Sequence, residues 1–154
     1  MTPDQDGARP GWREQITGHL PDAGLRPAAG AAALDAAERA LGHPLGPELC
    51  GLPAETDGVA GPYGEDVVWP VDRMVEKNRF FRTFPDFRDL YAPFDGLLLI
   101  GEHGNGDLFA LPADPSAGGA VLVWEHETDT RTEAAPGLRG YLARALTETA
   151  DWYH

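Results

Sequence analysis

The chain has 154 residues, of which 42% are hydrophobic and 24% charged, values typical of a globular domain that can bury a core without metal or disulfide support. Twelve Lys and Arg residues oppose 25 Asp and Glu residues, and the net charge of −13 disfavours binding to nucleic acid or to an anionic lipid surface. The most strongly apolar run, Leu97 to Ile100, is far shorter than the roughly 20 residues that span a bilayer. The polar start, Met1 to Pro10, lacks the pattern of a signal peptide, and the lone Cys50 excludes an intrachain disulfide, so we expect a cytoplasmic protein.

Charge is segregated along the chain. Residues 48–66 carry five acidic residues and no Lys or Arg, and residues 102–133 carry seven acidic residues against Arg131 alone. Between them, residues 73–88 hold five basic residues against two acidic ones. The acidity can simply keep the protein in solution, or it can attract a basic partner and speed its association. The basic middle can pair with its acidic flanks or form part of a mixed interface, and both interpretations stay open.

The amino-terminal part is predicted to be helical after a loose start. Residues 1–11 are interpreted as a flexible tail, and residues 12–154 as a single domain. Three short helices are predicted from apolar residues at four-residue spacing, an alanine-rich run that ends at a glycine, and a proline at a first helical position. The first two cover residues 12–20 and 28–41, and the third begins at Pro47.

The rest of the chain is predicted to be mainly strands. Short apolar or β-branched runs bounded by turn residues predict strands at residues 67–69, 97–100, 108–111 and 121–124. Between the first two of these strands we expect a helical turn or two and then an aromatic-rich stretch without a clear helical or strand spacing. At the end of the chain, a proline at residue 136 opens a final amphipathic helix. Because short loops join neighbouring strands antiparallel, we expect the α+β class. The expected fold is one antiparallel sheet of about four to six strands, flanked by N-terminal helices and a C-terminal helix.

A glycine-rich loop, Ile100 to Asp107, joins two of the predicted strands. Its Asn105-Gly106 pair favours a tight two-residue hairpin turn. A glycine-rich loop can also bind phosphate, but that site needs a helix after the loop, and here a strand follows. We therefore expect a hairpin rather than a nucleotide site.

A second polar segment, Trp124 to Arg131, follows the last predicted strand. It contains residue types that bind divalent metals, but it has no paired ligand spacing, so we interpret it as a polar turn capped by its own side chains. Trp124 is either partly buried core or an anchor for a partner. A metal- or nucleotide-dependent enzyme would require His103, Asp107 and His126 to converge. No nucleophile–base motif appears, and we predict no catalysis, no cofactor and no metal.

Short motifs follow one another between residues 34 and 146. They are Glu38-Arg39-Ala40-Leu41-Gly42, Leu45-Gly46-Pro47-Glu48-Leu49, Thr56-Asp57-Gly58-Val59 with Tyr63-Gly64 and Val68-Trp69, Leu98 to Asp107, Val121 to Glu127, and Ala135 to Leu142. Their order and spacing resemble the SUKH superfamily, which includes yeast cell-wall-assembly regulators and many bacterial immunity proteins. Gly46 stands where the family pattern has a proline.

The resemblance implies an α+β fold that acts by binding and has no known catalytic chemistry. The chain is accordingly expected to be an immunity protein that neutralises a protein toxin, often a nuclease, and its acidity suits a basic toxin. The alternative is a regulatory scaffold that binds a cellular protein. Side chains of the two hairpins are expected to contact the partner: Glu102, His103, Asn105, Asp107, Trp124, Glu125, His126, Glu127 and Asp129.

Overall fold

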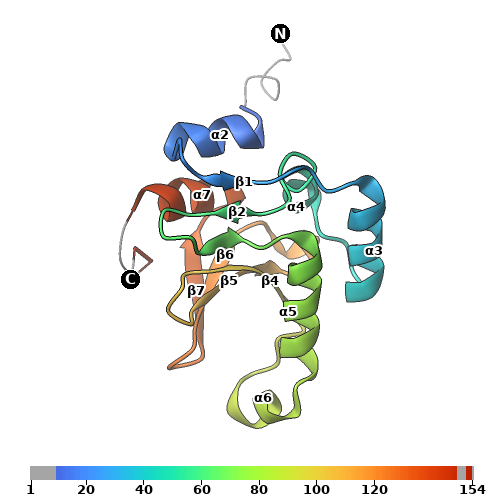
Figure 1. The fold of residues 1–154 in the computed structure, drawn as a ribbon. Helices are drawn as coiled ribbons and strands as arrows, with labels where there is room; N and C mark the ends of the chain where they lie inside the picture. Colours follow the sequence, from blue (N-terminus) through green and yellow to red (C-terminus); the bar gives the residue numbers. More distant parts are fainter. Residues whose placement is uncertain (1–9, 149–151, 154) are drawn as a thin grey trace.

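Helices occupy the amino-terminal half of the chain and its carboxyl end (Figure 1). The structure is a computed structural model that describes residues 10–148 and 152–153, so the predicted tail, residues 1–11, lies outside the described residues apart from Pro10 and Gly11. The helices are α2 (Trp12–His19), α3 (Ala31–Leu41), α4 (Pro47–Gly51), α5 (Val71–Thr83), α6 (Pro85–Leu90), the 3-10 turn η1 (Pro115–Ala117) and α7 (Leu138–Thr147). The three predicted N-terminal helices and the C-terminal helix are confirmed.

The strands form two antiparallel sheets, with the orders β1-β2-β3 and β4-β5-β6-β7. They are β1 (Gly24–Leu25), β2 (Val59–Ala60), β3 (Asp66–Val68), β4 (Leu97–Glu102), β5 (Leu108–Pro112), β6 (Val121–Glu125) and β7 (Thr130–Ala135). The predicted α+β class is confirmed, and the strands expected in one sheet are divided between two.

Two elements differ most from the prediction. Helix α5 continues to Thr83 because Val71, Met74 and Asn78 place a buried side chain on one of its faces every three or four positions. Strand β7 occupies residues interpreted as part of a polar turn, and the turn itself is confined to residues 126–129. The side chains of β7 lack the alternation of apolar and polar residues that marks a strand, so pairing with β6 determines its conformation.

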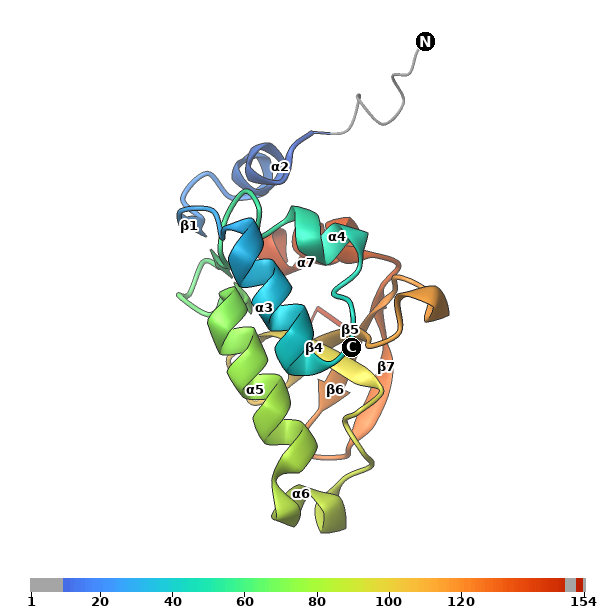
Figure 2. The same cartoon turned by 90° about the vertical axis from the view of Figure 1, so that its right-hand side faces the viewer.

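The helices flank the sheets in two pairs. Helix α3 lies beside α5, which packs against β4 (Figure 2). Helix α2 packs on α7, and α7 contacts β3 and β7. Helix α6 follows α5 at the end of the molecule opposite to α2 (Figures 1 and 2). The α5–α6 corner is therefore held mainly by its own aromatic contacts and by the loop that leads into β4.

The edges of β3 and β4 meet and join the two sheets. The Trp69 N–H donates to the Ile100 carbonyl at 2.8 Å, where a bulge between Leu99 and Gly101 shifts the register of β4. Asn78 of α5 covers the same strand edge. Its side-chain amide accepts from the Leu99 N–H and donates to the Leu99 carbonyl, each at 2.8 Å. An open strand edge leaves backbone N–H and carbonyl groups unpaired. The buried Asn78 amide therefore supplies the hydrogen bonds that a neighbouring strand would otherwise make to Leu99.

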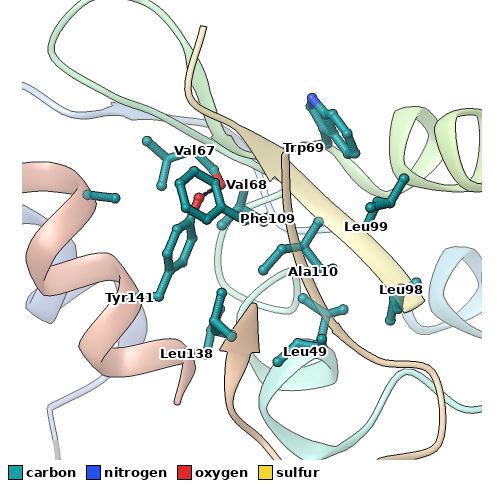
Figure 3. Packing of buried hydrophobic residues seen from close by; sticks show 14 of the residues in the cluster. Leu49, Val67, Val68, Trp69, Leu98, Leu99, Phe109, Ala110, Leu138 and Tyr141 are labelled. Atoms are coloured by element: carbon teal, nitrogen blue, oxygen red, sulfur yellow. Dashed lines mark hydrogen bonds between the residues drawn. The ribbon is translucent and has the colours of Figure 1, made fainter. Parts of the chain in front are cut away.

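The core contains one fully buried tyrosine. The buried apolar side chains form a single cluster that extends from α2 to Trp152. Within it, the Tyr141 hydroxyl of α7 donates to the Val67 carbonyl of β3 at 2.6 Å (Figure 3). Burial raises the pKa of Tyr141 well above its usual value, and the nearby carboxylates of Glu65 and Glu102 raise it further. The hydroxyl therefore stays protonated and remains a donor that holds α7 to the small sheet.

Tyr141→Phe is expected to lower the free energy of unfolding by about 1–2 kcal/mol, because the Val67 carbonyl loses a buried donor while the ring still fills its site. Urea denaturation followed by circular dichroism measures the change. Tyr63→Phe is the matched control, since the Tyr63 side chain is 75% exposed, and it is expected to leave the unfolding midpoint unchanged. Equal stabilities of the Tyr141 variant and the wild type would contradict the structural role of this hydroxyl.

Candidate functional site

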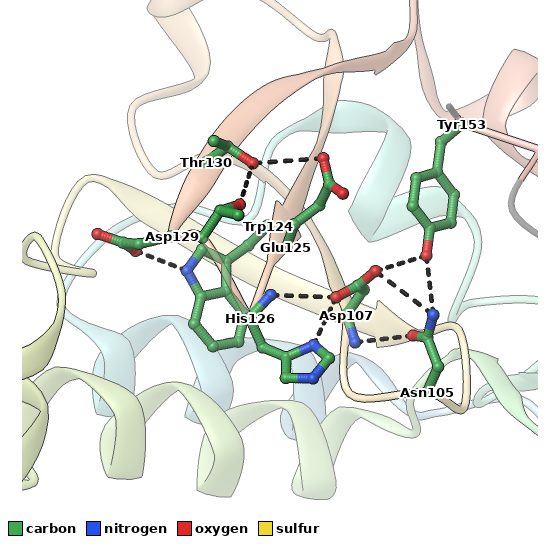
Figure 4. A network of polar contacts seen from close by, with 9 residues as sticks. Asn105, Asp107, Trp124, Glu125, His126, Asp129, Thr130 and Tyr153 are labelled. Atoms are coloured by element: carbon green, nitrogen blue, oxygen red, sulfur yellow. Dashed lines mark hydrogen bonds and ion pairs between the residues drawn. The ribbon is translucent and has the colours of Figure 1, made fainter.

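A buried carboxylate connects the two hairpin loops that the sequence singled out. Asp107, which is 5% exposed, precedes β5, and its Oδ1 accepts from the His126 backbone N–H at 3.0 Å and from His126 Nδ1 at 2.6 Å. Its Oδ2 accepts from the Tyr153 hydroxyl at 2.6 Å and from Asn105 Nδ2 at 3.4 Å (Figure 4). The carboxylate thus fixes the β4–β5 loop, the β6–β7 turn and a residue near the carboxyl end relative to one another.

The charge of Asp107 is stabilised by its donors. Burial alone would raise the pKa of this carboxyl, but the hydrogen bonds from Tyr153 and His126 outweigh that effect and lower it. Asp107 therefore remains an ionised acceptor at neutral pH. Since Tyr153 and His126 take up both of its oxygens, its part in the site is to position the loops.

The β4–β5 connection is longer than the predicted two-residue turn. It spans residues 103–107 and is closed by a hydrogen bond from the His103 N–H to the Asp107 carbonyl at 3.1 Å. Asn105 Oδ1 accepts the Asp107 N–H at 2.9 Å, so a side chain satisfies a group that a tight turn would pair with backbone. Gly106 has a φ of 105°, and a Cβ there would lie 2.9 Å from the His126 ring. Glycine thus allows the two loops to touch.

Asp129 organises the β6–β7 turn in a similar way. Its Oδ1 accepts from Trp124 Nε1 at 2.7 Å and from Arg131 at 3.1 Å, and its Oδ2 accepts from the Ala92 N–H at 2.9 Å. Burial raises the pKa of this carboxyl, while the bonds from Ala92, Trp124 and Arg131 together lower it. Trp124 is only 4% exposed, so it is a core residue and was not available as the proposed anchor for a partner. The turn is capped by its own side chain, as the sequence suggested.

The predicted site residues fall into four groups. Asn105, Asp107 and His126 form the network around the buried carboxylate, and Trp124 and Asp129 form the second network. Glu102 and His103 line a pocket beside α7. Glu125 is half-buried, accepts from Thr130 at 3.3 Å and lies at the end of β6, whereas Glu127 is exposed in the turn. The structure therefore brings the two hairpins together, buries Asp107 and Trp124, and leaves the other predicted residues partly or fully exposed.

A metal-dependent or nucleotide-dependent site would need His103 to join Asp107 and His126. Asp107 and His126 do converge, but no group of three or more His, Cys, Asp or Glu side chains among residues 10–148 and 152–153 is arranged to hold a metal ion. The glycine-rich loop leads into strand β5 and not into a helix, so it lacks the helix N-terminus that binds phosphate.

The structure reveals an aromatic surface to which the sequence assigned no role. Its members lie on α5, on α6 and directly after α6, and their rings contact one another and the buried ring of Phe94: Phe80, Phe81, Phe84, Phe87 and Tyr91. Phe80 is 47% exposed and Leu90 66% exposed. We call these aromatic residues, together with Leu90, the α5–α6 aromatic surface. A pocket of about 390 Å³ opens in it between Phe81, Phe87 and Tyr91. In the sequence, the density of aromatic residues is the feature that could have indicated this surface, but Pro85 interrupts their helical spacing.

Three hollows follow one another along this face of the molecule. The pocket of the aromatic surface shares Phe81 with a hollow of about 280 Å³, and that hollow shares Glu102 with a pocket of about 210 Å³ beside α7. The middle hollow is lined in part by Gly104 and Gly106 of the β4–β5 loop. A continuous, uneven surface therefore runs from α7 past the fixed hairpin loop to α6. We call it the hairpin face.

These features define a class: an α+β domain whose hairpin loops are fixed by the carboxylates of Asp107 and Asp129, beside a partly exposed aromatic surface. The model of the SMI1-KNR4 cell-wall family (SUKH_6) matches residues 31–142, and the chain belongs to this family. The resemblance drawn from the motifs is thereby confirmed. A search of curated proteins gives no match. Within residues 10–148 and 152–153, none of the helices is long and apolar enough to cross a bilayer.

Proposed function

We propose that the chain is a non-enzymatic immunity protein that binds a basic protein toxin, such as a nuclease, and blocks it in the cytoplasm. The hairpin face carries this proposal. Two of the three large hydrophobic residues that are prominently exposed in the described part of the chain, Phe80 and Leu90, lie on its aromatic surface. Exposed aromatic residues grouped around a pocket are typical of protein-binding hot spots.

The charge of the chain supports a basic partner. A net charge of −13 attracts a cationic protein over a distance comparable to the Debye length and raises its association rate. Toxins that cleave nucleic acid need cationic surfaces to hold phosphates, and an acidic inhibitor can cover such a surface. Family membership agrees with this role, because immunity proteins are common among SUKH proteins.

Co-expression of this chain with any polymorphic toxin encoded just upstream of it is expected to restore growth of a sensitive host. Purified chain and catalytically inactive toxin are expected to form a complex whose affinity falls as salt is raised. Survival that is no better than without the chain, together with no complex in calorimetry, would overturn the proposal and favour a regulatory scaffold.

Phe80→Ser combined with Leu90→Ser is expected to weaken toxin binding at least about tenfold, because both exposed side chains would lose their apolar contacts with the partner. The fold should survive, since neither side chain belongs to the buried core. Arg39→Ser on α3 is the control for an exposed site outside the hairpin face. Unchanged affinity of the double variant would show that the aromatic surface is not where the toxin binds.

A further inference from the structure

The pocket beside α7 has aromatic walls and an acidic rim. It encloses about 210 Å³ between the turn before β3, the end of β4 and α7. Carboxylates and aromatic rings line it together: Glu65, Glu102, Glu148, Phe109, Tyr141 and Trp152. Since a water molecule occupies about 30 Å³ of the liquid, the pocket has room for a side-chain head group with its adjoining methylenes.

Two of the carboxylates have no cationic partner within the described residues. Glu148 pairs with Arg144 at 3.0 Å. In contrast, Glu65 accepts the Tyr63 N–H at 2.9 Å, and Glu102 accepts Trp69 Nε1 at 3.1 Å, both neutral donors. None of the described lining residues is Lys or Arg, and Lys77, which lies over Trp69, lines the neighbouring hollow. The rim therefore carries negative charge that an incoming cation can neutralise.

The inner aromatic walls of the pocket are packed on one another, and one lining ring is left exposed. Phe109 and Trp152 stack with their ring centroids 5.4 Å apart and their planes at 7°. The chain itself places the Arg144 guanidinium over the Trp152 ring, at 4.8 Å from its centroid. Phe109 and Arg144 thus already cover Trp152, and the lining ring that remains open to a ligand is Tyr63, which is 75% exposed. Tyr141 contributes to the wall while its hydroxyl is engaged with Val67, so it does not compete for the ligand.

We propose that this pocket receives an arginine side chain of the partner, with its guanidinium between Glu65 and Glu102 and its methylenes against the exposed ring of Tyr63. The assignment rests on the proposed function and specifies how the basic partner is recognised. Arginine fits better than lysine because the planar guanidinium has five N–H donors and can pair with two carboxylates at the same time. The pocket provides a charge-selective anchor at the α7 end of the hairpin face.

N-acetyl-L-arginine amide tests the pocket without any toxin. Titration is followed by the NMR shift of the Trp152 indole N–H, with Trp12 and Trp124, which do not line the pocket, as internal references. We expect saturable binding of the arginine compound, and binding at least about tenfold weaker for N-acetyl-L-citrulline amide, which has the same shape without the charge. Equal binding of the two compounds, or no shift of Trp152 with either, would overturn the assignment.

Glu65→Gln with Glu102→Gln is the decisive variant. Each glutamine keeps an oxygen that can accept the bond from Tyr63 or Trp69, so the fold is retained while two charges are removed. We expect it to lose the arginine response, whereas the control Asp35→Asn with Glu133→Gln removes two exposed charges elsewhere and should keep it. In a toxin-binding assay, equal toxin affinities of the wild type and the Glu65/Glu102 variant would overturn this inference alone. Absence of any wild-type complex would overturn the proposed function instead.

Discussion

Replacing Gly101 by alanine is expected to lower the free energy of unfolding by about 4 kcal/mol or more, or to prevent folding altogether. A Cβ at this position would lie 1.9 Å from the Val67 carbonyl oxygen and 2.6 Å from its carbon. These are backbone atoms of β3, which cannot rotate away as a side chain can. The clash would separate β3 from β4, where the Trp69 N–H pairs with Ile100 and where Val67 also accepts the Tyr141 hydroxyl.

Gly96→Ala is the matched control for this substitution. Gly96 lies in the turn before β4, and a Cβ there would meet no atom within 4 Å. We expect its urea unfolding curve to lie close to that of the wild type. If Gly101→Ala were as stable as Gly96→Ala, the close approach of the two sheets would not be a requirement of the fold.

The local elements with strong apolar patterns were predictable from the sequence. Strands β4, β5 and β6 coincide with short runs of apolar residues, since a strand buried in the core needs apolar residues at nearly every position. Helix α7 follows from the apolar face that Leu138, Tyr141 and Leu142 provide. Helix α3 ends at Gly42, whose φ of 82° is the conformation that terminates helices.

The elements that depend on distant partners were not predictable in this way. β1 and β2 are two residues long and exist because they pair with each other and with β3. β7 is recognisable only through its register with β6. The division into two sheets depends on a bulge at Gly101 and on Asn78, a polar residue in a helix that completes a strand edge 21 residues away in sequence. Such long-range pairing leaves no periodic signal in a single sequence.

The candidate site shows the same limit. The sequence pattern places Asp107 and His126 on neighbouring hairpins, and in the structure His126 Nδ1 lies 2.6 Å from Asp107 Oδ1. It could not anticipate that Tyr153, 46 residues further on, would complete the network. It also chose polar residues as partner contacts, although Asp107 and Asp129 are occupied in holding the loops. Phe80 of α5 and Leu90 of α6 are the exposed large apolar side chains of these two helices and are open to a partner.

Asp107→Ala is expected to lower the free energy of unfolding by about 3 kcal/mol at pH 7. The substitution leaves the His126 N–H groups and the Tyr153 hydroxyl without their charged acceptor, and both hairpin loops lose their common anchor. Glu127→Ala, in the same turn but exposed, is the control and should change stability by no more than about 0.5 kcal/mol. Urea denaturation of the three proteins under identical conditions gives both differences.

The pH dependence of this difference identifies the charge as the cause. The folded-state pKa of Asp107 lies below its unfolded value of about 3.9, so its ionised form contributes stability that is fully present above about pH 5. That contribution is lost as the pH falls through the folded-state pKa, where both states are protonated. The wild type and Asp107→Ala should therefore differ most at pH 5 to 7 and converge below about pH 4. A gap that stays constant down to pH 3 would mean that the volume of the side chain, and not its ionised carboxylate, holds the two hairpins together.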